Sequence, residues 1–115
     1  MNSNEQNQPK TEWKISIMRD QRRRNGWVRL YIRTDRTCRR FSADAKVYDL
    51  PDGTGDDYMG YGVREGSRVS KLSIRDLDHY PRLEVYNWDR GLDFDDAPEG
   101  LVDAIVNYCD ALSQS

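Results

Sequence analysis

Hydrophobic and polar residues alternate in two stretches near the start of the chain. Trp13, Ile15 and Ile17 occupy every second position after residue 12, and a second alternation runs from Trp27 to Arg33. A repeat of two residues is typical of a strand with one buried face. The intervening segment, residues 19–26 (RDQRRRNG), ends in an Asn-Gly turn signal and predicts a basic hairpin loop.

A long hairpin loop favours one register between these two strands. It would set Ile17 opposite Val28 and Ile15 opposite Leu30, so that both pairs lie on the buried face. A tight two-residue turn would instead pair the isoleucines with polar residues. We therefore predict the longer loop.

A third strand is predicted from about residue 39 to residue 48. Its inward positions are Phe41, Ala43, Ala45 and Val47. The short connection before it, residues 34–37, predicts a register in which Leu30 lies opposite Phe41 and Tyr31 lies opposite Arg40.

Two further strands and one helix are predicted in the second half of the chain. The strands are expected at residues 68–74 and 82–88. A helix is expected to begin at an Asp96 N-cap, with Pro98 and Glu99 in its first turn. Its buried face would carry Val102, Ile105, Cys109 and Leu112, and its opposite face Asp103, Asn107 and Asp110.

These elements predict an α+β fold, an antiparallel meander of about five strands with one C-terminal helix packed on the sheet. Residues 1–10 are polar and are expected to form a disordered tail before a single domain at 11–115. A small five-stranded barrel of the oligonucleotide-binding type is the alternative. The glycine-rich segment 51–66 argues against the barrel. It predicts a long loop at the place where such a barrel usually has a helix.

Charge is divided between the two halves of the chain. Residues 1–46 carry a net charge of +7 and residues 47–115 a net charge of −9, within a total of −2. Such asymmetry suggests an electrostatic partner. Fourteen of the 18 basic residues are arginine, whose planar guanidinium suits carboxylate, phosphate and aromatic contacts.

The outward positions of the second and third strands, with the loop beside them, form the candidate partner-binding surface. Its residues are Arg22, Arg23, Arg24, Trp27, Arg29, Tyr31, Arg33, Arg40 and Lys46. Aromatic rings between arginines suit stacked bases and phosphates, and they equally suit a protein interface. The structural alternative is that Trp27 and Tyr31 pack on a second sheet or on a second copy of the chain.

The acidic half offers a secondary candidate surface. Its residues are Asp52, Asp56, Asp57, Asp93 and Asp95. A calcium loop would need a glutamate that closes the ligand set, and the glycine-rich segment has none at the matching position. We therefore expect no metal there.

Catalytic chemistry has little support in the sequence. His79 is the only histidine, and no nucleophile, zinc or phosphate-loop motif occurs. Cys38 and Cys109 are far apart in the chain and are expected to be free thiols. We predict neither an enzyme nor a cofactor. The polar first ten residues lead us to expect no signal peptide, and no apolar run has the length of a membrane span, so a cytoplasmic location is expected.

A non-enzymatic interaction protein is therefore the expected function. It would dock a charge-segregated surface on a larger protein or nucleoprotein complex and act as an inhibitor or regulator. In size and charge, though not in any motif, the chain resembles inhibitors that phages and mobile elements encode, such as anti-CRISPR and immunity proteins. Direct nucleic-acid binding through the arginine and aromatic surface is the alternative, although an overall pI of 5.4 is low for such a protein.

Overall fold

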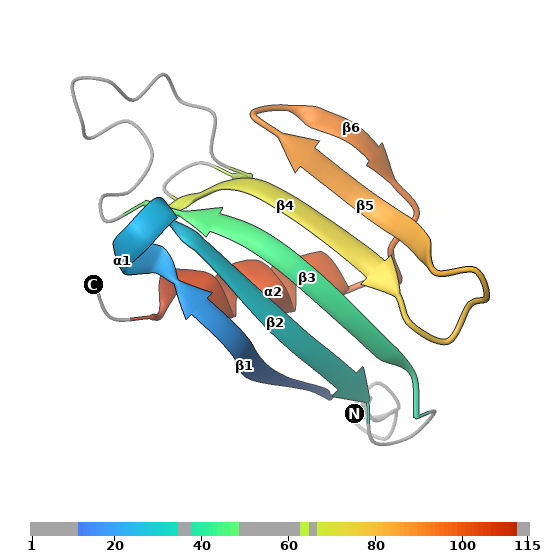
Figure 1. Cartoon of the computed structure of the whole chain (residues 1–115). Helices are drawn as coiled ribbons and strands as arrows, with labels where there is room; N and C mark the ends of the chain where they lie inside the picture. The colour runs from blue at the N-terminus through green and yellow to red at the C-terminus, as the bar shows by residue number, and fades with distance from the viewer. Residues whose placement is uncertain (1–11, 35–37, 49–62, 65–66, 113–115) are drawn as a thin grey trace, which may run out of the picture.

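Six strands form one antiparallel sheet in which the spatial order follows the sequence order (Figure 1). The computed structural model describes residues 12–34, 38–48, 63–64 and 67–112. The strands are β1 (Trp13–Gln21), β2 (Trp27–Thr34), β3 (Arg40–Val47), β4 (Val69–Asp76), β5 (Leu83–Asp89) and β6 (Leu92–Asp95). A four-residue turn of helix, α1 (Arg22–Asn25), joins β1 to β2, and α2 (Leu101–Asp110) follows the sheet.

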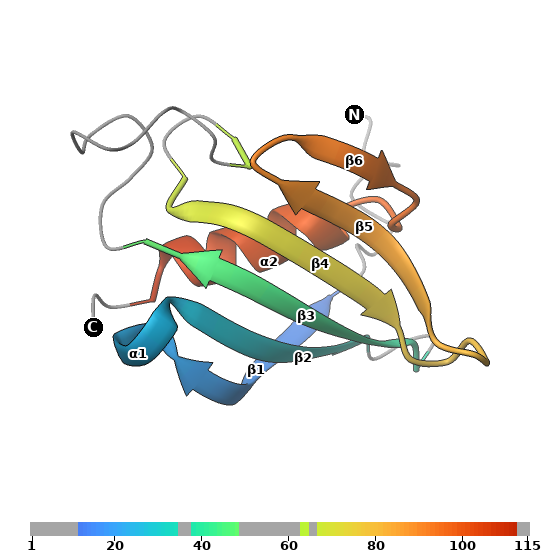
Figure 2. The same ribbon diagram turned by 45° about the horizontal axis from the view of Figure 1, so that its top comes forward.

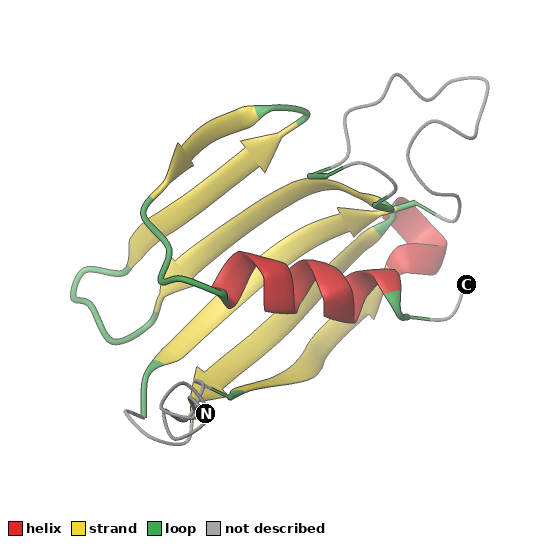
Figure 3. Cartoon of the chain, turned by 180° about the vertical axis from the view of Figure 1, so that it is seen from behind, coloured by secondary structure: helices red, strands yellow, loops and turns green. Residues whose placement is uncertain are grey.

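The predicted α+β meander with a C-terminal helix is confirmed, with six strands rather than five. The sheet stays open, with β1 and β6 at its two edges, so the barrel alternative is wrong (Figure 1). Helix α2 crosses one face of the sheet (Figure 3). In the turned view of Figure 2, α2 passes behind β3 and β4 and the β5–β6 hairpin forms the upper edge of the sheet. Among the described helices, none combines the length and apolarity needed to cross a bilayer.

The hydrophobic core lies between the sheet and α2. The inward residues predicted for β2 and β3 are all buried: Val28, Leu30, Ile32, Phe41, Ala43, Ala45 and Val47. Leu101, Ile105, Val106 and Cys109 cover them from α2. The two alanines are small, and this leaves room for the helix to approach β3 closely.

The predicted register of the first hairpin is wrong by two residues. Ile17 lies opposite Leu30, and Ile15 lies opposite Ile32. The reason is that β1 continues to Gln21, with a bulge at Met18, so the connection is only α1 and Gly26. Ile17 is also more exposed than predicted, at 39%, because β1 is an edge strand and its far end extends past the core.

The second hairpin shows the same error of two residues. Leu30 lies opposite Ala43 rather than Phe41, and Tyr31 lies opposite Ser42 rather than Arg40. The register differs because Thr34 pairs with Arg39, its N–H donating to the Arg39 carbonyl at 3.0 Å, whereas the predicted register would place Thr34 opposite Thr37. A shift of two residues keeps every side chain on its predicted face, since the strand repeat is also two.

Two boundaries in the second half of the chain differ from prediction. Strand β6 was not predicted, because four residues with two aspartates carry no clear strand signal. Helix α2 begins at Leu101, not after an Asp96 cap, because the Asp96 N–H donates to the Val85 carbonyl at 2.7 Å and holds the chain against β5 directly after β6 ends. Gly100 precedes the helix with a φ of 88°, a conformation that favours glycine.

The expected helix faces are only partly correct. Ile105 and Cys109 are buried as predicted, but Val102 and Leu112 are only half-buried. Asp110, expected on the solvent face, instead accepts a hydrogen bond from the backbone N–H of Arg68 at 2.8 Å. It therefore contributes to the packing of α2 on the start of β4.

Candidate partner-binding face

The face of the sheet opposite α2 carries most of the residues predicted to bind a partner. Alternation along each strand directs one set of side chains away from the helix. We call this set the outer face: Lys14, Ser16, Arg19, Gln21, Trp27, Arg29, Tyr31, Arg33, Arg40, Ser42, Asp44, Lys46, Lys71, Ser73, Arg75, Glu84, Asn87, Asp89 and Phe94. Six of the nine predicted residues belong to it, and the other three, Arg22, Arg23 and Arg24, lie on α1 at one end of the sheet.

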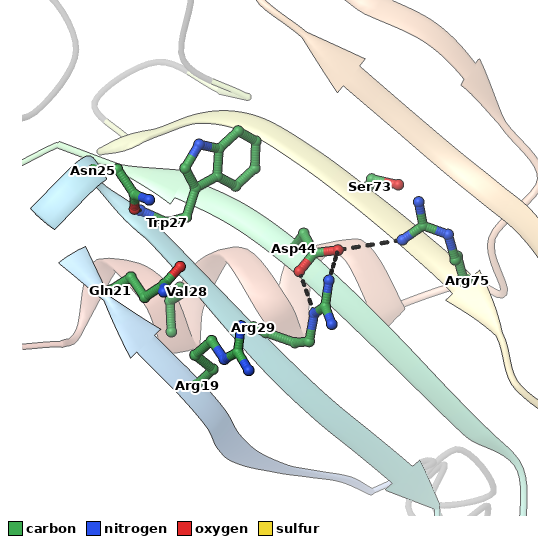
Figure 4. A pocket seen from close by; sticks show the side chains of 9 residues that line it. All are labelled: Arg19, Gln21, Asn25, Trp27, Val28, Arg29, Asp44, Ser73 and Arg75. Carbon is green, nitrogen blue, oxygen red and sulfur yellow. Dashed lines mark hydrogen bonds and ion pairs between the residues drawn. The ribbon is translucent and has the colours of Figure 1, made fainter.

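Asp44 organises the middle of the outer face. Its carboxylate accepts hydrogen bonds from the Arg29 guanidinium at 2.7 and 3.3 Å, and from Arg75 Nη1 at 3.2 Å (Figure 4). Arg29 lies directly opposite Asp44 on β3. The hydrogen bond to Asp44, and the charge of its carboxylate, raise the pKa of Arg29. The three side chains therefore form a fixed Arg–Asp–Arg group across three strands.

Sequence reasoning missed both Asp44 and Arg75. Alternation along the third strand does place Asp44 outward, among basic neighbours, and this signal could have identified it. Arg75 reaches Asp44 from β4, through a strand pairing that no local pattern predicts.

A hollow of about 360 Å³ lies between this group and the end of the first hairpin (Figure 4). Arg19, Gln21 and Asn25 line it from β1 and α1, and Trp27 lines it from the start of β2. The Trp27 backbone N–H donates to the Asn25 side-chain oxygen at 3.1 Å, which fixes the turn beside the indole. Guanidinium groups next to an aromatic ring can hold a planar or anionic group by stacking and by paired hydrogen bonds.

Arg40 and Tyr31 occupy the other end of the outer face. The Asp78 carboxylate accepts hydrogen bonds from the Arg40 backbone N–H at 2.7 Å and from its Nε at 2.9 Å. These two bonds and the charge of Arg40 lower the pKa of Asp78. The side-chain hydrogen bond to Asp78 and the charge of the Asp78 carboxylate raise the pKa of Arg40, with a smaller contribution from Tyr31. Arg40 is thus positioned beside the Tyr31 ring by the turn between β4 and β5.

The three arginines predicted to lie in a basic hairpin loop belong instead to the helical turn α1, and they are not equally exposed. Arg22 donates from Nε and Nη2 to the two oxygens of Asp20, at 2.9 and 2.8 Å, and its side chain is only 11% exposed. Arg23 and Arg24 are exposed. Of the three α1 arginines, Arg23 and Arg24 are therefore the two whose charge faces solvent.

Lys46 lies close to this end of the sheet. It is opposite Trp27, and its ammonium group is 5.9 Å from the centre of the Tyr48 ring. Its alkyl chain lies about 3.4 Å from the position that a side chain at Gly26 would occupy. Lys46 therefore lies beside the turn at Gly26, with its ammonium group directed to the Tyr48 ring.

Of the secondary acidic residues, the two that the structure describes lie apart from the predicted basic surface. Asp93 and Asp95 lie on β6, at the far edge of the sheet. Asp52, Asp56 and Asp57, like the glycine-rich segment weighed as a calcium loop, lie outside the described residues. Within the described ranges, no three His, Cys, Asp or Glu side chains come together as a metal site would require.

No known protein family matches the chain, and no match is found among curated proteins or solved structures. Its function is therefore inferred from the chemistry of its surfaces.

Proposed function

We propose that this chain is a non-enzymatic binding protein that docks its outer face on an acidic surface of a larger protein and so inhibits or regulates it. The observation that supports this proposal is the position of Trp27 and Tyr31, which stand partly exposed between fixed arginines on a sheet face that none of the described helices covers. Tryptophan, tyrosine and arginine are the residues that most often dominate the binding energy of protein interfaces.

The carboxylate of Asp44 favours a protein over a nucleic acid as the partner. It lies in the middle of the outer face and neutralises part of the charge of Arg29 and Arg75. A phosphate in the hollow beside it would be repelled by this carboxylate, whereas a protein surface can present a carboxylate to one arginine and a donor to Asp44. Mixed charge of this kind gives specificity through complementary pairing.

A capture experiment tests the proposal. The immobilised full chain is exposed to lysate of its host, with and without nuclease, and bound protein and nucleic acid are both quantified. The Trp27→Ala/Arg29→Ala variant tests the outer face, and Arg82→Ala, which removes an exposed arginine before β5, is the matched control. We expect one stoichiometric protein that survives nuclease, is retained by the control and is lost with the double variant.

Two results would overturn the proposal. One is recovery of nucleic acid with no stoichiometric protein, together with salt-sensitive binding of a labelled oligonucleotide in fluorescence anisotropy. The other is equal capture of the protein by the double variant and by the wild type, which would place the interface elsewhere.

A further inference from the structure

A second hollow, of about 380 Å³, lies on the other side of the sheet, between α2 and the β5–β6 hairpin. Helix α2 packs on β1, β3 and β4 but does not extend over the hairpin in the same way. The space left between them is lined by Trp88 and Leu92 from the hairpin and by Val102 from α2. Leu92 is 56% exposed, so the apolar wall of this groove opens to solvent.

Carboxylates surround this apolar wall. Asp95, Glu99 and Asp103 all line the groove. Burial is the main cause that raises the pKa of Tyr86, at the base of the groove, to about 12, and the charges of Asp95 and Asp103 add to it. Tyr86, Asp95 and Asp103 therefore line one and the same groove.

One end of the groove already holds a guanidinium group of the chain itself. Arg64 donates to the Asp103 carboxylate at 3.0 Å and to the side-chain oxygen of Asn107. At the other end, one oxygen of Asp95 accepts the Ala97 N–H at 3.1 Å. In the described part of the chain, neither Asp95 nor Glu99 forms an ion pair, so this end keeps its negative charge.

The start of α2 reduces that negative charge only in part. A helix N-terminus carries the equivalent of roughly half a positive charge. Asp95 and Glu99 bring two full negative charges to the same end. A cation is therefore favoured there over an anion.

We propose that this groove binds an arginine side chain of a partner protein. The alkyl stem would lie on Trp88 and Leu92, and the guanidinium would reach Asp95 and Glu99. Arginine is favoured over lysine because its planar guanidinium carries five N–H donors and can donate to two carboxylates at once. The groove is on the opposite side of the sheet from the outer face, so this proposal does not depend on the proposed function.

A titration with short peptides, followed by proton–nitrogen NMR spectra of the full chain, tests this site. The probe is acetyl-Gly-Arg-Gly-amide, and its neutral control is the same peptide with citrulline, which has almost the same shape. We expect saturable shifts of the Trp88 indole N–H and the Gly100 amide at millimolar peptide, with no such shifts for citrulline. The Trp27 indole, on the outer face, should not move.

Two variants locate the charge that carries binding. Asp95→Asn keeps an oxygen for the Ala97 N–H but removes the negative charge, and it should weaken the arginine peptide at least threefold. Asp89→Asn removes the same charge from an exposed position on β5 outside the groove, and should leave binding unchanged.

The proposal would be overturned by equal binding of the citrulline peptide, by unchanged affinity in folded Asp95→Asn, or by shifts centred on Trp27. Equal or tighter binding of the corresponding lysine peptide would overturn the preference for arginine. None of these results depends on whether the outer face binds a protein.

Discussion

Arg68 and Asp110 are bonded to each other twice, and together they join the end of α2 to the start of β4. The Arg68 backbone N–H donates to the Asp110 carboxylate at 2.8 Å, and its Nη1 donates to the Asp110 carbonyl at 3.1 Å. The same guanidinium donates to the carbonyls of Tyr48 at 2.8 Å and Leu112 at 2.7 Å. Arg68 is only 8% exposed, so these bonds are largely shielded from water.

Replacing this arginine should destabilise the fold strongly. Arg68→Met leaves three carbonyl groups without their donor, and we expect the free energy of unfolding to fall by about 2–4 kcal/mol. Arg68→Lys should also lose stability, because one ammonium cannot reach all three carbonyls. Urea denaturation measures both, with Arg82→Met as the exposed control. A change within about 0.5 kcal/mol for Arg68→Met would show that the bonds contribute little.

Two buried serines allow a second test of hydrogen bonding. Ser67 donates to Asp110 at 3.2 Å and accepts the Val69 N–H at 3.0 Å. The Ser70 hydroxyl is equally buried but has no hydrogen-bond partner among the described residues. We expect Ser67→Ala to cost about 1–2 kcal/mol and Ser70→Ala to be neutral or stabilising, as measured by denaturant unfolding. The reverse order would mean that Ser70 finds a partner in the folded protein.

The two cysteines should differ in reactivity. Burial raises the pKa of Cys109 to about 12, with a further contribution from Asp110, and its side chain faces the core. Cys38 is exposed. Because the thiolate is the reactive form, one thiol per chain should react with a disulfide reagent at pH 8 in the native protein, and two in denaturant. The Cys38→Ser variant should show no fast reaction; a fast reaction there would mean that α2 opens readily.

Stability should decrease in acid. The hydrogen bonds from Arg22 lower the pKa of Asp20, and the bonds from Arg40 lower that of Asp78. Burial alone would raise the pKa of Glu84, but the hydrogen bonds from Ser73 and Asn87 outweigh it, and the pKa is lowered.

A carboxyl group with a lower pKa in the folded state stabilises the fold above its ordinary pKa, 3.8 for Asp and 4.5 for Glu. That contribution is lost as the pH falls through the folded value. We therefore expect urea denaturation to show a plateau near neutral pH and a decline below about pH 4.5. Asp78→Asn should be less stable than wild type at pH 7 and should approach it at pH 2. Parallel curves for the two proteins would exclude a role for this carboxylate.

Local sequence patterns predicted which face of each strand is buried better than they predicted which residues pair between neighbouring strands. Alternation identified the buried positions of β2 and β3, because a half-buried strand shows its period in the sequence. Alternation could not determine the register, because the bulge at Met18 and the pairing of Thr34 with Arg39 depend on neighbouring strands. For the same reason the sequence did not reveal the Arg–Asp–Arg group of the outer face, because Arg75 reaches Asp44 only through the pairing of β3 with β4. Asp96 has the sequence context of a helix N-cap, but its backbone N–H donates to the carbonyl of Val85, eleven residues earlier. The chain is therefore still bonded to β5 at this point.

The outer face and α1 should control different steps of binding to the partner. Arg23 and Arg24 are exposed, so the Arg23→Ala/Arg24→Ala variant should keep its stability within about 0.5 kcal/mol. Their charge can act at long range, and we expect this variant to associate more slowly and with less dependence on salt. Arg29→Ala and Tyr31→Ala remove central contacts, and each should mainly speed dissociation. Arg29→Ala also leaves Arg75 as the remaining ion-pair partner of Asp44, so the Asp44 carboxylate should repel an acidic partner more strongly.

Surface plasmon resonance on the captured partner separates these effects, because it measures association and dissociation independently. Arg22→Ala completes the comparison, since its guanidinium is held by Asp20 and is mostly covered. This variant should lose stability through the free Asp20 carboxylate while affecting association less than the Arg23/Arg24 change. If all of these variants keep the partner affinity within a factor of two, the basic half of the chain is only a solvated surface. The binding site would then lie on the acidic side, around β6 and the start of α2.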